Sequence, residues 1–148
     1  MTNNKQLFEC MIMHSSHLDV DLIYCIKYDN LEFFKLLTTF KDIVTPTSTN
    51  KQFLSTIKQY ISQHNAINIC DYLLNHHSIW WHENLTRCTM LFHTPQFQYN
   101  CIKHNSIDVL KIIGLQTPCY LSNMYKADLI KLSLKYNRYE IIKFINEN

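Results

Sequence analysis

The sequence is poor in glycine and proline, with one glycine and three prolines in 148 residues. A Rossmann fingerprint or a phosphate-binding P-loop needs several glycines, so the single Gly114 excludes both. Hydrophobic residues make up 47% of the chain and charged residues 18%, which excludes disordered, collagen-like and glycine-rich linker proteins. The length predicts a single domain spanning residues 1–148.

Clusters of positive charge and long apolar runs are missing as well. No two Lys or Arg residues are adjacent and the net charge is +2, so nucleic acid is not an expected partner. No apolar run reaches the length of about 18 residues that a membrane helix needs, and the first residues do not form a signal peptide. We therefore expect no membrane partner and a cytoplasmic protein. The six cysteines are then expected to be reduced and packed as small hydrophobic side chains: Cys10, Cys25, Cys70, Cys88, Cys101 and Cys119.

One thirteen-residue pattern occurs four times without a gap. The copies read CIKYDNLEFFKLL, ISQHNAINICDYL, CIKHNSIDVLKII and SLKYNRYEIIKFI, and they begin at Cys25, Ile61, Cys101 and Ser133. Each copy has an apolar stretch, a polar tetrad and a second apolar stretch at helical spacing, which predicts a helix, a turn and a second helix.

The same place in the turn is always Asp or Asn: Asp29, Asn65, Asn105 and Asn137, separated by 36, 40 and 32 residues. These are the non-glycine side chains that best tolerate positive φ, so the pattern predicts a left-handed residue that ends each first helix. We call these four residues the hinges. On this basis, glycine at any hinge is expected to be neutral or stabilising.

The second helix of each copy has an apolar face and a charged face. The apolar pairs are expected to point inward: Leu31/Phe34, Ile107/Leu110 and Tyr139/Ile142. The charged pairs, three residues apart, are expected to lie on a solvated face: Glu32/Lys35, Asp108/Lys111 and Glu140/Lys143.

Helical periodicity continues outside the repeated pattern, and no segment has the alternation of a strand. Helices are expected at residues 5–14, 19–28, 30–38, 50–63, 66–75, 78–92, 96–104, 106–114, 122–136 and 138–146. The first of them, residues 5–14, is amphipathic and is expected to cap the exposed edge of the first copy, since the end of a helical stack needs such a cover.

The repeated pattern resembles the middle of an ankyrin repeat, in which two small residues, two variable residues and Gly-His precede Leu-Glu-Ile-Val-Lys-Leu-Leu. Asp or Asn stands at the glycine of that family, and the segment Leu31 to Leu37 is similar to its second helix. The resemblance covers residues 18–148 and implies an all-α solenoid of about four helix–turn–helix repeats. The β-hairpins of the family are in doubt here, because its Thr-Pro-Leu-His opening is absent and only Thr94 of a Thr-Pro pair stands near the family position.

Divergent repeats rich in Asn, Ile, Lys and Tyr are similar to those of large AT-rich DNA viruses, both poxviruses and the multigene families of African swine fever virus. This resemblance implies a viral factor that acts in the host cytosol and binds a host or viral protein. A protein–protein interaction module is the first interpretation, because stacked helical pairs expose a long surface and no reactive motif is present. The residues expected to contact the partner lie in the segment that lengthens the second repeat interval: His76, His77, Trp80, Trp81 and His82.

Two other interpretations stay open. A compact viral Bcl-2-like bundle that binds a helical peptide in a groove fits the length, although it gives no reason for four hinges in phase. A zinc-stabilised domain would use the histidine-rich segment with Cys88 and His93, but no Cys-x-x-Cys knuckle accompanies it. No metal, no cofactor and no enzymatic activity are expected, because no cysteine or histidine lies in a nucleophile elbow and no carboxylate pair shares a predicted pocket.

Overall fold

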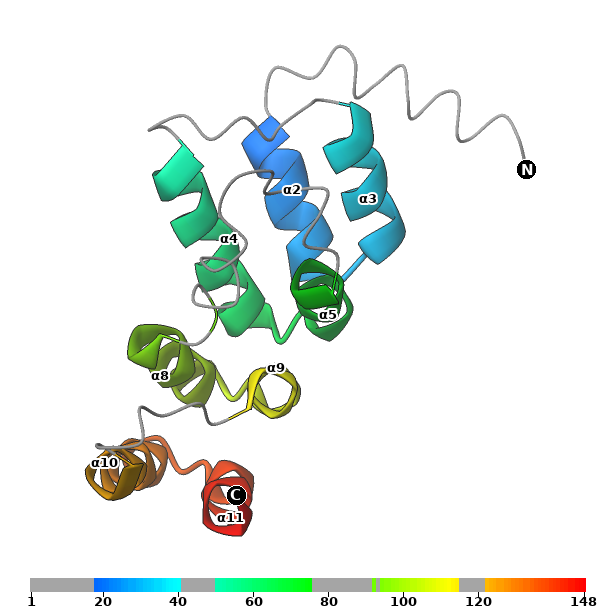
Figure 1. The fold of residues 1–148 in the computed structure, drawn as a ribbon. Helices are drawn as coiled ribbons and strands as arrows, with labels where there is room; N and C mark the ends of the chain where they lie inside the picture. Colours follow the sequence, from blue (N-terminus) through cyan, green and yellow to red (C-terminus); the bar gives the residue numbers. More distant parts are fainter. Residues whose placement is uncertain (1–17, 41–49, 76–91, 93, 115–121) are drawn as a thin grey trace.

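The computed structural model describes residues 18–40, 50–75, 92, 94–114 and 122–148 (Figure 1). In these residues the chain forms eight helices and no strand, so the described part is all-α. The helices are α2 (Leu18–Lys27), α3 (Leu31–Phe40), α4 (Asn50–His64), α5 (Ile67–Asn75), α8 (Pro95–His104), α9 (Ile107–Ile113), α10 (Ser122–Lys135) and α11 (Tyr139–Glu147). Their ends agree with the expected ones within one or two residues. The helices expected at 5–14 and 78–92 fall mainly or wholly outside the described residues.

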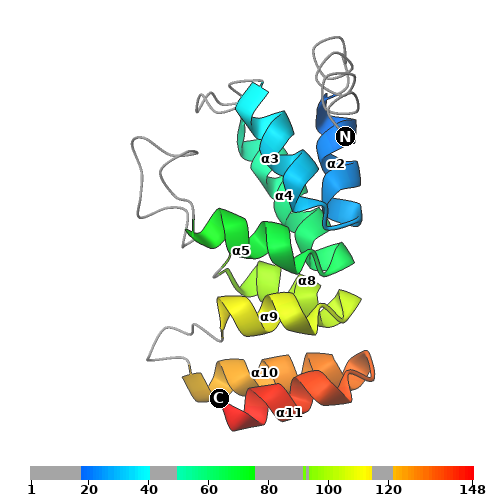
Figure 2. The same cartoon turned by 90° about the vertical axis from the view of Figure 1, so that its right-hand side faces the viewer.

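The helices form four consecutive pairs, α2/α3, α4/α5, α8/α9 and α10/α11, and the two members of each pair contact each other. The first helices also contact one another in the order α2, α4, α8 and α10, while the second helices contact in the order α3, α5, α9 and α11. Figures 1 and 2 show the pairs following one another from α2/α3 to α10/α11, with the axes turning between the first pair and the last. The described chain is therefore two helical layers deep.

The core lies between these two layers and is in phase with the repeated pattern. The residue four positions before each hinge is buried in every pair: Cys25, Ile61, Cys101 and Ser133. In the second helices, Phe34, Cys70 and Leu110 share a position five residues after the hinge and are buried as well. The buried residues form one cluster that extends from Leu22 to Ile145. Burial of apolar side chains at the same position in successive pairs holds the layers together.

The inward expectation for the second helices is confirmed for Phe34 and Leu110, which are buried, and is wrong for Tyr139, which is 69% exposed. Tyr139 is the first residue of α11, and no further pair covers it in the described chain. Leu134 of α10 is 52% exposed, although the residues at its position in the other pairs, Ile26, Ser62 and Ile102, are fully buried. Both differences arise at the last pair, which contacts a neighbouring pair on one side only in the described chain.

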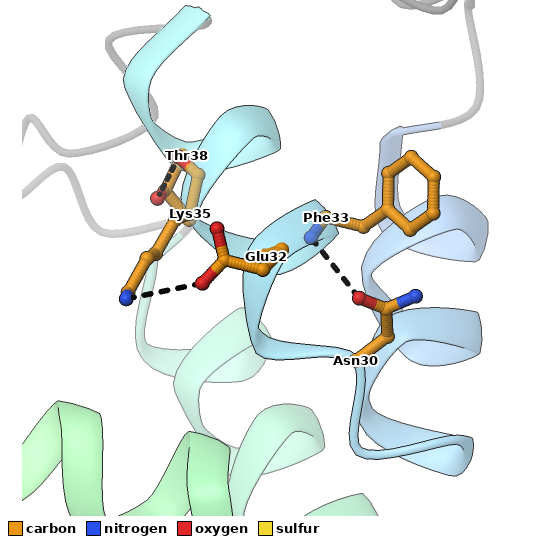
Figure 3. A network of polar contacts seen from close by, with 5 residues as sticks. All are labelled: Asn30, Glu32, Phe33, Lys35 and Thr38. Atoms are coloured by element: carbon orange, nitrogen blue, oxygen red, sulfur yellow. Dashed lines mark hydrogen bonds and ion pairs between the residues drawn. The ribbon is translucent and has the colours of Figure 1, made fainter. Parts of the chain in front are cut away.

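Two helix starts follow local capping rules. Thr94 accepts a hydrogen bond from the Phe97 N–H, and Pro95 follows as the first helical residue of α8. At α3, Asn30 Oδ1 accepts from the Phe33 N–H at 3.2 Å (Figure 3). Within the described ranges, no helix is both long and apolar enough to cross a membrane.

Candidate functional site

The four turns that contain the hinges, each between a first helix and its second helix, lie on one side of the described chain, at the right of Figure 2. Their φ values are 48°, 53°, 62° and 56° for Asp29, Asn65, Asn105 and Asn137. They are the non-glycine residues with positive φ in the described chain, so the predicted left-handed conformation is confirmed.

Each turn is closed by the same backbone hydrogen bond. The residue after the hinge donates its N–H to the carbonyl oxygen five positions earlier; in the third pair this bond joins Ser106 to Cys101 at 2.8 Å. The hinge N–H of Asn105 also donates to Ile102 O. This combination is a Schellman motif, which satisfies the last carbonyl groups of a helix and requires a left-handed residue. The left-handed conformation of the hinge therefore allows the hydrogen bond that ends the first helix at each turn.

The hinge side chain of the first pair reaches the second pair. The Asp29 carboxylate accepts three hydrogen bonds at the start of α5: from the Asn68 N–H at 3.0 Å, the Asn68 side-chain amide at 2.8 Å and the Ile69 N–H at 3.0 Å. The first N–H groups of a helix have no partner within that helix and carry partial positive charge. Asp29 thus acts as an N-cap supplied by the neighbouring pair.

Asn65 repeats this arrangement one pair later. Its Oδ1 accepts from the Val109 N–H at 3.1 Å, and its amide group donates to Asp108 Oδ2 at 2.8 Å. The pair Asp108/Lys111 was expected only to lie on a solvated face, but Asp108 also accepts a hydrogen bond that links the second and third pairs. Of the other expected charged pairs, Glu32/Lys35 is present, with Lys35 Nζ 3.4 Å from Glu32 Oε1 (Figure 3). Lys143 pairs with Glu147 and not with Glu140, its Nζ lying 3.9 Å from Glu147 Oε1.

We call the contact between two consecutive pairs a joint. The third joint, between α8/α9 and α10/α11, has different hydrogen bonds from the first two. Among the described residues, no side chain accepts a hydrogen bond from the first N–H groups of α11, and the Asn105 side chain makes no hydrogen bond there. Instead, Arg138 Nη2 donates to the Lys103 carbonyl oxygen at 3.1 Å, across the turns of the third and fourth pairs. The Arg138 Nε is buried without a hydrogen-bond partner. Contact between these two turns therefore runs from the later pair back to the earlier one.

The two residues before each hinge form a second in-phase feature. A ring side chain comes directly before every hinge, and lysine precedes the ring in three of the four turns. The rings are Tyr28, His64, His104 and Tyr136, and the lysines are Lys27, Lys103 and Lys135. We call these seven residues, together with Arg138, the hinge edge. Its lysines are all exposed.

Cations and rings meet repeatedly along the hinge edge. Lys27 Nζ lies 5.4 Å from the ring centroid of Tyr28, and Lys135 Nζ lies 5.7 Å from that of Tyr136, both within cation–π range. His64 stacks on Tyr60 with centroids 5.9 Å apart. Lysines in the last turn of a helix also complement its macrodipole, which gives them a local stabilising role.

His104 reports the electrostatics of this edge. Its pKa is lowered from the usual value, mainly by burial and further by the positive charges of Lys103, His64 and Arg138. Near neutral pH the imidazole is therefore uncharged.

The three cysteines that the structure describes are free thiols in the core: Cys25, Cys70 and Cys101. Burial is the main cause that raises the pKa of Cys25 to about 11 and that of Cys70 to about 12, with the charge of Asp21 contributing at Cys25. Burial also raises the pKa of Cys101. At neutral pH such thiols are protonated, and the protonated thiol is a poor nucleophile and a poor metal ligand. Cys10, Cys88 and Cys119 lie outside the described residues.

The residues predicted to contact the partner, His76, His77, Trp80, Trp81 and His82, lie outside the described residues, as do Cys88 and His93. In the described ranges, no group of three or more His, Cys, Asp or Glu side chains could hold a metal ion. Sequence reasoning missed the hinge edge and the bonds between pairs. A signal for the edge was present, since Lys-Tyr-Asp, Lys-His-Asn and Lys-Tyr-Asn recur at one phase.

Comparison of the chain with protein-family models, with curated proteins and with solved structures finds no match.

Proposed function

We propose that the chain is a short solenoid of helix–turn–helix repeats that binds another protein. The observation that carries the proposal is the hinge of one pair capping the second helix of the next, at Asp29 and again at Asn65. Bonds of this kind join neighbouring repeats in register. They build an extended surface from side chains that share one phase.

The ankyrin resemblance supports the same proposal at the hinge. Ankyrin repeats carry glycine where this chain has Asp or Asn, and the positive φ at these positions is the conformation for which glycine is usually selected. The Thr94–Pro95 start of α8 is similar to the Thr-Pro opening of that family. The amphipathic segment 5–14 would serve as the N-terminal capping helix of the solenoid.

The viral part of the proposal rests on sequence style alone. A chain rich in Asn, Ile, Lys and Tyr, with degenerate ankyrin-like repeats, fits a viral factor that binds a host or viral protein in the host cytosol. Within the described residues, the buried and protonated thiols offer no activated nucleophile. We therefore propose binding without catalysis, cofactor or metal.

The proposal is tested by capture of proteins from cytosolic extract on the immobilised chain, followed by mass spectrometry. Trp80→Ala and Trp81→Ala, made separately, test the predicted contact segment. A captured protein that is lost with one variant, while the melting temperature is retained, supports binding there. A loss of stability of several kcal/mol at both positions would show that both tryptophans are core residues. Failure to retain any protein above an empty-matrix control contradicts the proposed function.

A further inference from the structure

We propose that the hinge edge of the third and fourth pairs binds an acidic, extended segment of the partner protein. This inference rests on the proposed function and narrows it to one surface and one partner chemistry. The surface consists of Lys103, His104, Lys135, Tyr136 and Arg138, with His64 beside it.

Fixed positive charges without a countercharge carry the first step. Lys103 and Lys135 are exposed, and no carboxylate in the described chain lies within ion-pair distance of either. The hydrogen bond from Arg138 to the Lys103 carbonyl ties a third cation to the end of α8. Lys103 and Arg138 both act on His104, whose pKa is lowered mainly by burial and then by these charges. A partner with carboxylates would relieve this concentration of positive charge.

The carboxylates on the same side offset the positive charge only in part. Asp29 and Asp108 accept hydrogen bonds at the joints between pairs. Glu140, on the first turn of α11, is exposed and makes no ion pair within the described residues. At these two turns the three cations Lys103, Lys135 and Arg138 therefore face two carboxylates, Asp108 and Glu140, which leaves an excess of positive charge.

The planar rings between the cations favour a peptide over a compact anion. His104 and Tyr136 occupy the same place in successive turns, and Lys135 lies over the Tyr136 ring. Ring side chains at successive turns offer contact area to an extended chain at low entropic cost. Nucleic acid fits less well, because phosphate backbones require many cations, whereas this chain has a net charge of +2 and no adjacent lysines.

The test uses a fluorescein-labelled oligoglutamate peptide and fluorescence anisotropy at low ionic strength. We expect the native chain to bind the probe and the Lys103→Gln/Lys135→Gln variant to bind it about three- to tenfold more weakly, on the scale expected for two exposed ion pairs. The matched control is Lys131→Gln/Lys143→Gln, which removes the same charge from two exposed lysines of α10 and α11 that already pair with Asp128 and Glu147. The control is expected to bind like the native chain.

A gain of binding makes the test independent of misfolding. Glu140→Gln removes one of the two opposing charges and is expected to tighten binding about twofold, whereas Glu147→Gln, remote from the hinges at the end of α11, leaves binding unchanged. Equal weakening by both lysine pairs, absence of probe binding, or no gain with Glu140→Gln would overturn the proposal. Tighter binding of single-stranded DNA, lost with the same lysine pair, would identify a nucleic-acid surface instead.

The outcome is separable from the proposed function. If a protein captured from extract is retained equally by the native chain and by Lys103→Gln/Lys135→Gln, protein binding stands and the hinge edge is not its site. If no protein is captured but the two lysine-pair variants still differ in oligoglutamate binding, the hinge edge binds acidic ligands and the proposed binding of a protein is contradicted.

Discussion

The joint between the second and third pairs and the joint between the third and fourth pairs use the same elements with different bonds. At the earlier joint, Asn65 extends forward and caps α9 through the Val109 N–H. At the later joint, Asn105 has the same backbone conformation but caps nothing in the described chain, and Arg138 extends backward to Lys103. A hinge therefore has two separable roles: its backbone ends a helix, and its side chain can join two pairs.

The side-chain role depends on what the neighbour presents. Asp108 accepts from the Asn65 amide and orients it, so that Oδ1 faces the α9 backbone. The corresponding residue of the last pair is Glu140, which is one methylene longer and exposed. Besides the Arg138 bond, the last joint has a part-buried polar contact between the first helices, where the Tyr125 hydroxyl donates to Gln98 Oε1.

The largest expected effect on stability separates the third pair from the fourth at one position of their first helices. Ile102 and Leu134 share one position, but Ile102 is 0% exposed and Leu134 is 52% exposed. Ile102→Ala is expected to lower the free energy of unfolding by about 2–5 kcal/mol. Leu134→Ala is expected to change it by less than about 0.5 kcal/mol. Urea denaturation of both variants checks this, and equal losses would mean that the last pair is covered as fully as the third.

Glycine at the hinges separates their two roles. Glycine keeps the positive φ, so Asp29→Gly removes only the side-chain bonds to α5 and is expected to cost about 1–3 kcal/mol. Asn105→Gly removes no side-chain hydrogen bond to a neighbouring pair in the described chain and is expected to be neutral or stabilising by up to about 1 kcal/mol. The sequence-based expectation of neutrality therefore stays a prediction for Asn105 and is changed for Asp29, whose side chain bonds to α5. Thermal unfolding of the two variants, measured side by side, would contradict this account if Asn105→Gly were the more damaging.

The polar contact between Tyr125 and Gln98 at the last joint can be removed by deleting one hydroxyl group. Tyr125→Phe leaves Gln98 Oε1, in a fully buried residue, without its donor. Loss of one buried hydrogen bond is expected to cost about 1–2 kcal/mol. Tyr99→Phe is the matched control, because Tyr99 packs beside Tyr125 through its ring. Equal stability of Tyr125→Phe and the native chain, by denaturant midpoint, would show that this bond does not hold the joint.

The smallest expected effect concerns pH at the same joint. The pKa of His104 is lower in the folded chain than in the unfolded chain, mainly because of burial and then because of Lys103, His64 and Arg138. Below the unfolded value of about 6.5, the unfolded state takes up the proton more readily, so stability falls as the pH falls. His104→Gln is expected to lose less stability than the native chain between neutral and mildly acidic pH. An unchanged pH profile of the melting temperature would contradict the assignment.

Much of the local structure was predictable from the residues. Helix positions followed from apolar spacing, and the left-handed hinges followed from Asp or Asn at one phase, because both effects depend on a few neighbouring residues. The predicted contact segment that contains Trp80 and Trp81 stays a prediction. The hinge edge could have been found from the recurring Lys-ring-Asx triplet, but alignment of the turns in space gives that recurrence its meaning.

Asp29 and Asn105 together show what the local sequence determines and what only the packing of the pairs determines. Their identical backbone conformation was encoded locally, since only a small polar side chain or glycine relieves the strain of positive φ. Their different bonds, the exposure of Tyr139 and the burial of Ile102 were set by packing, because each depends on which helix start lies opposite and whether another pair covers the layer. Such partners are distant in the sequence, and the spacing within one repeat carries no record of them.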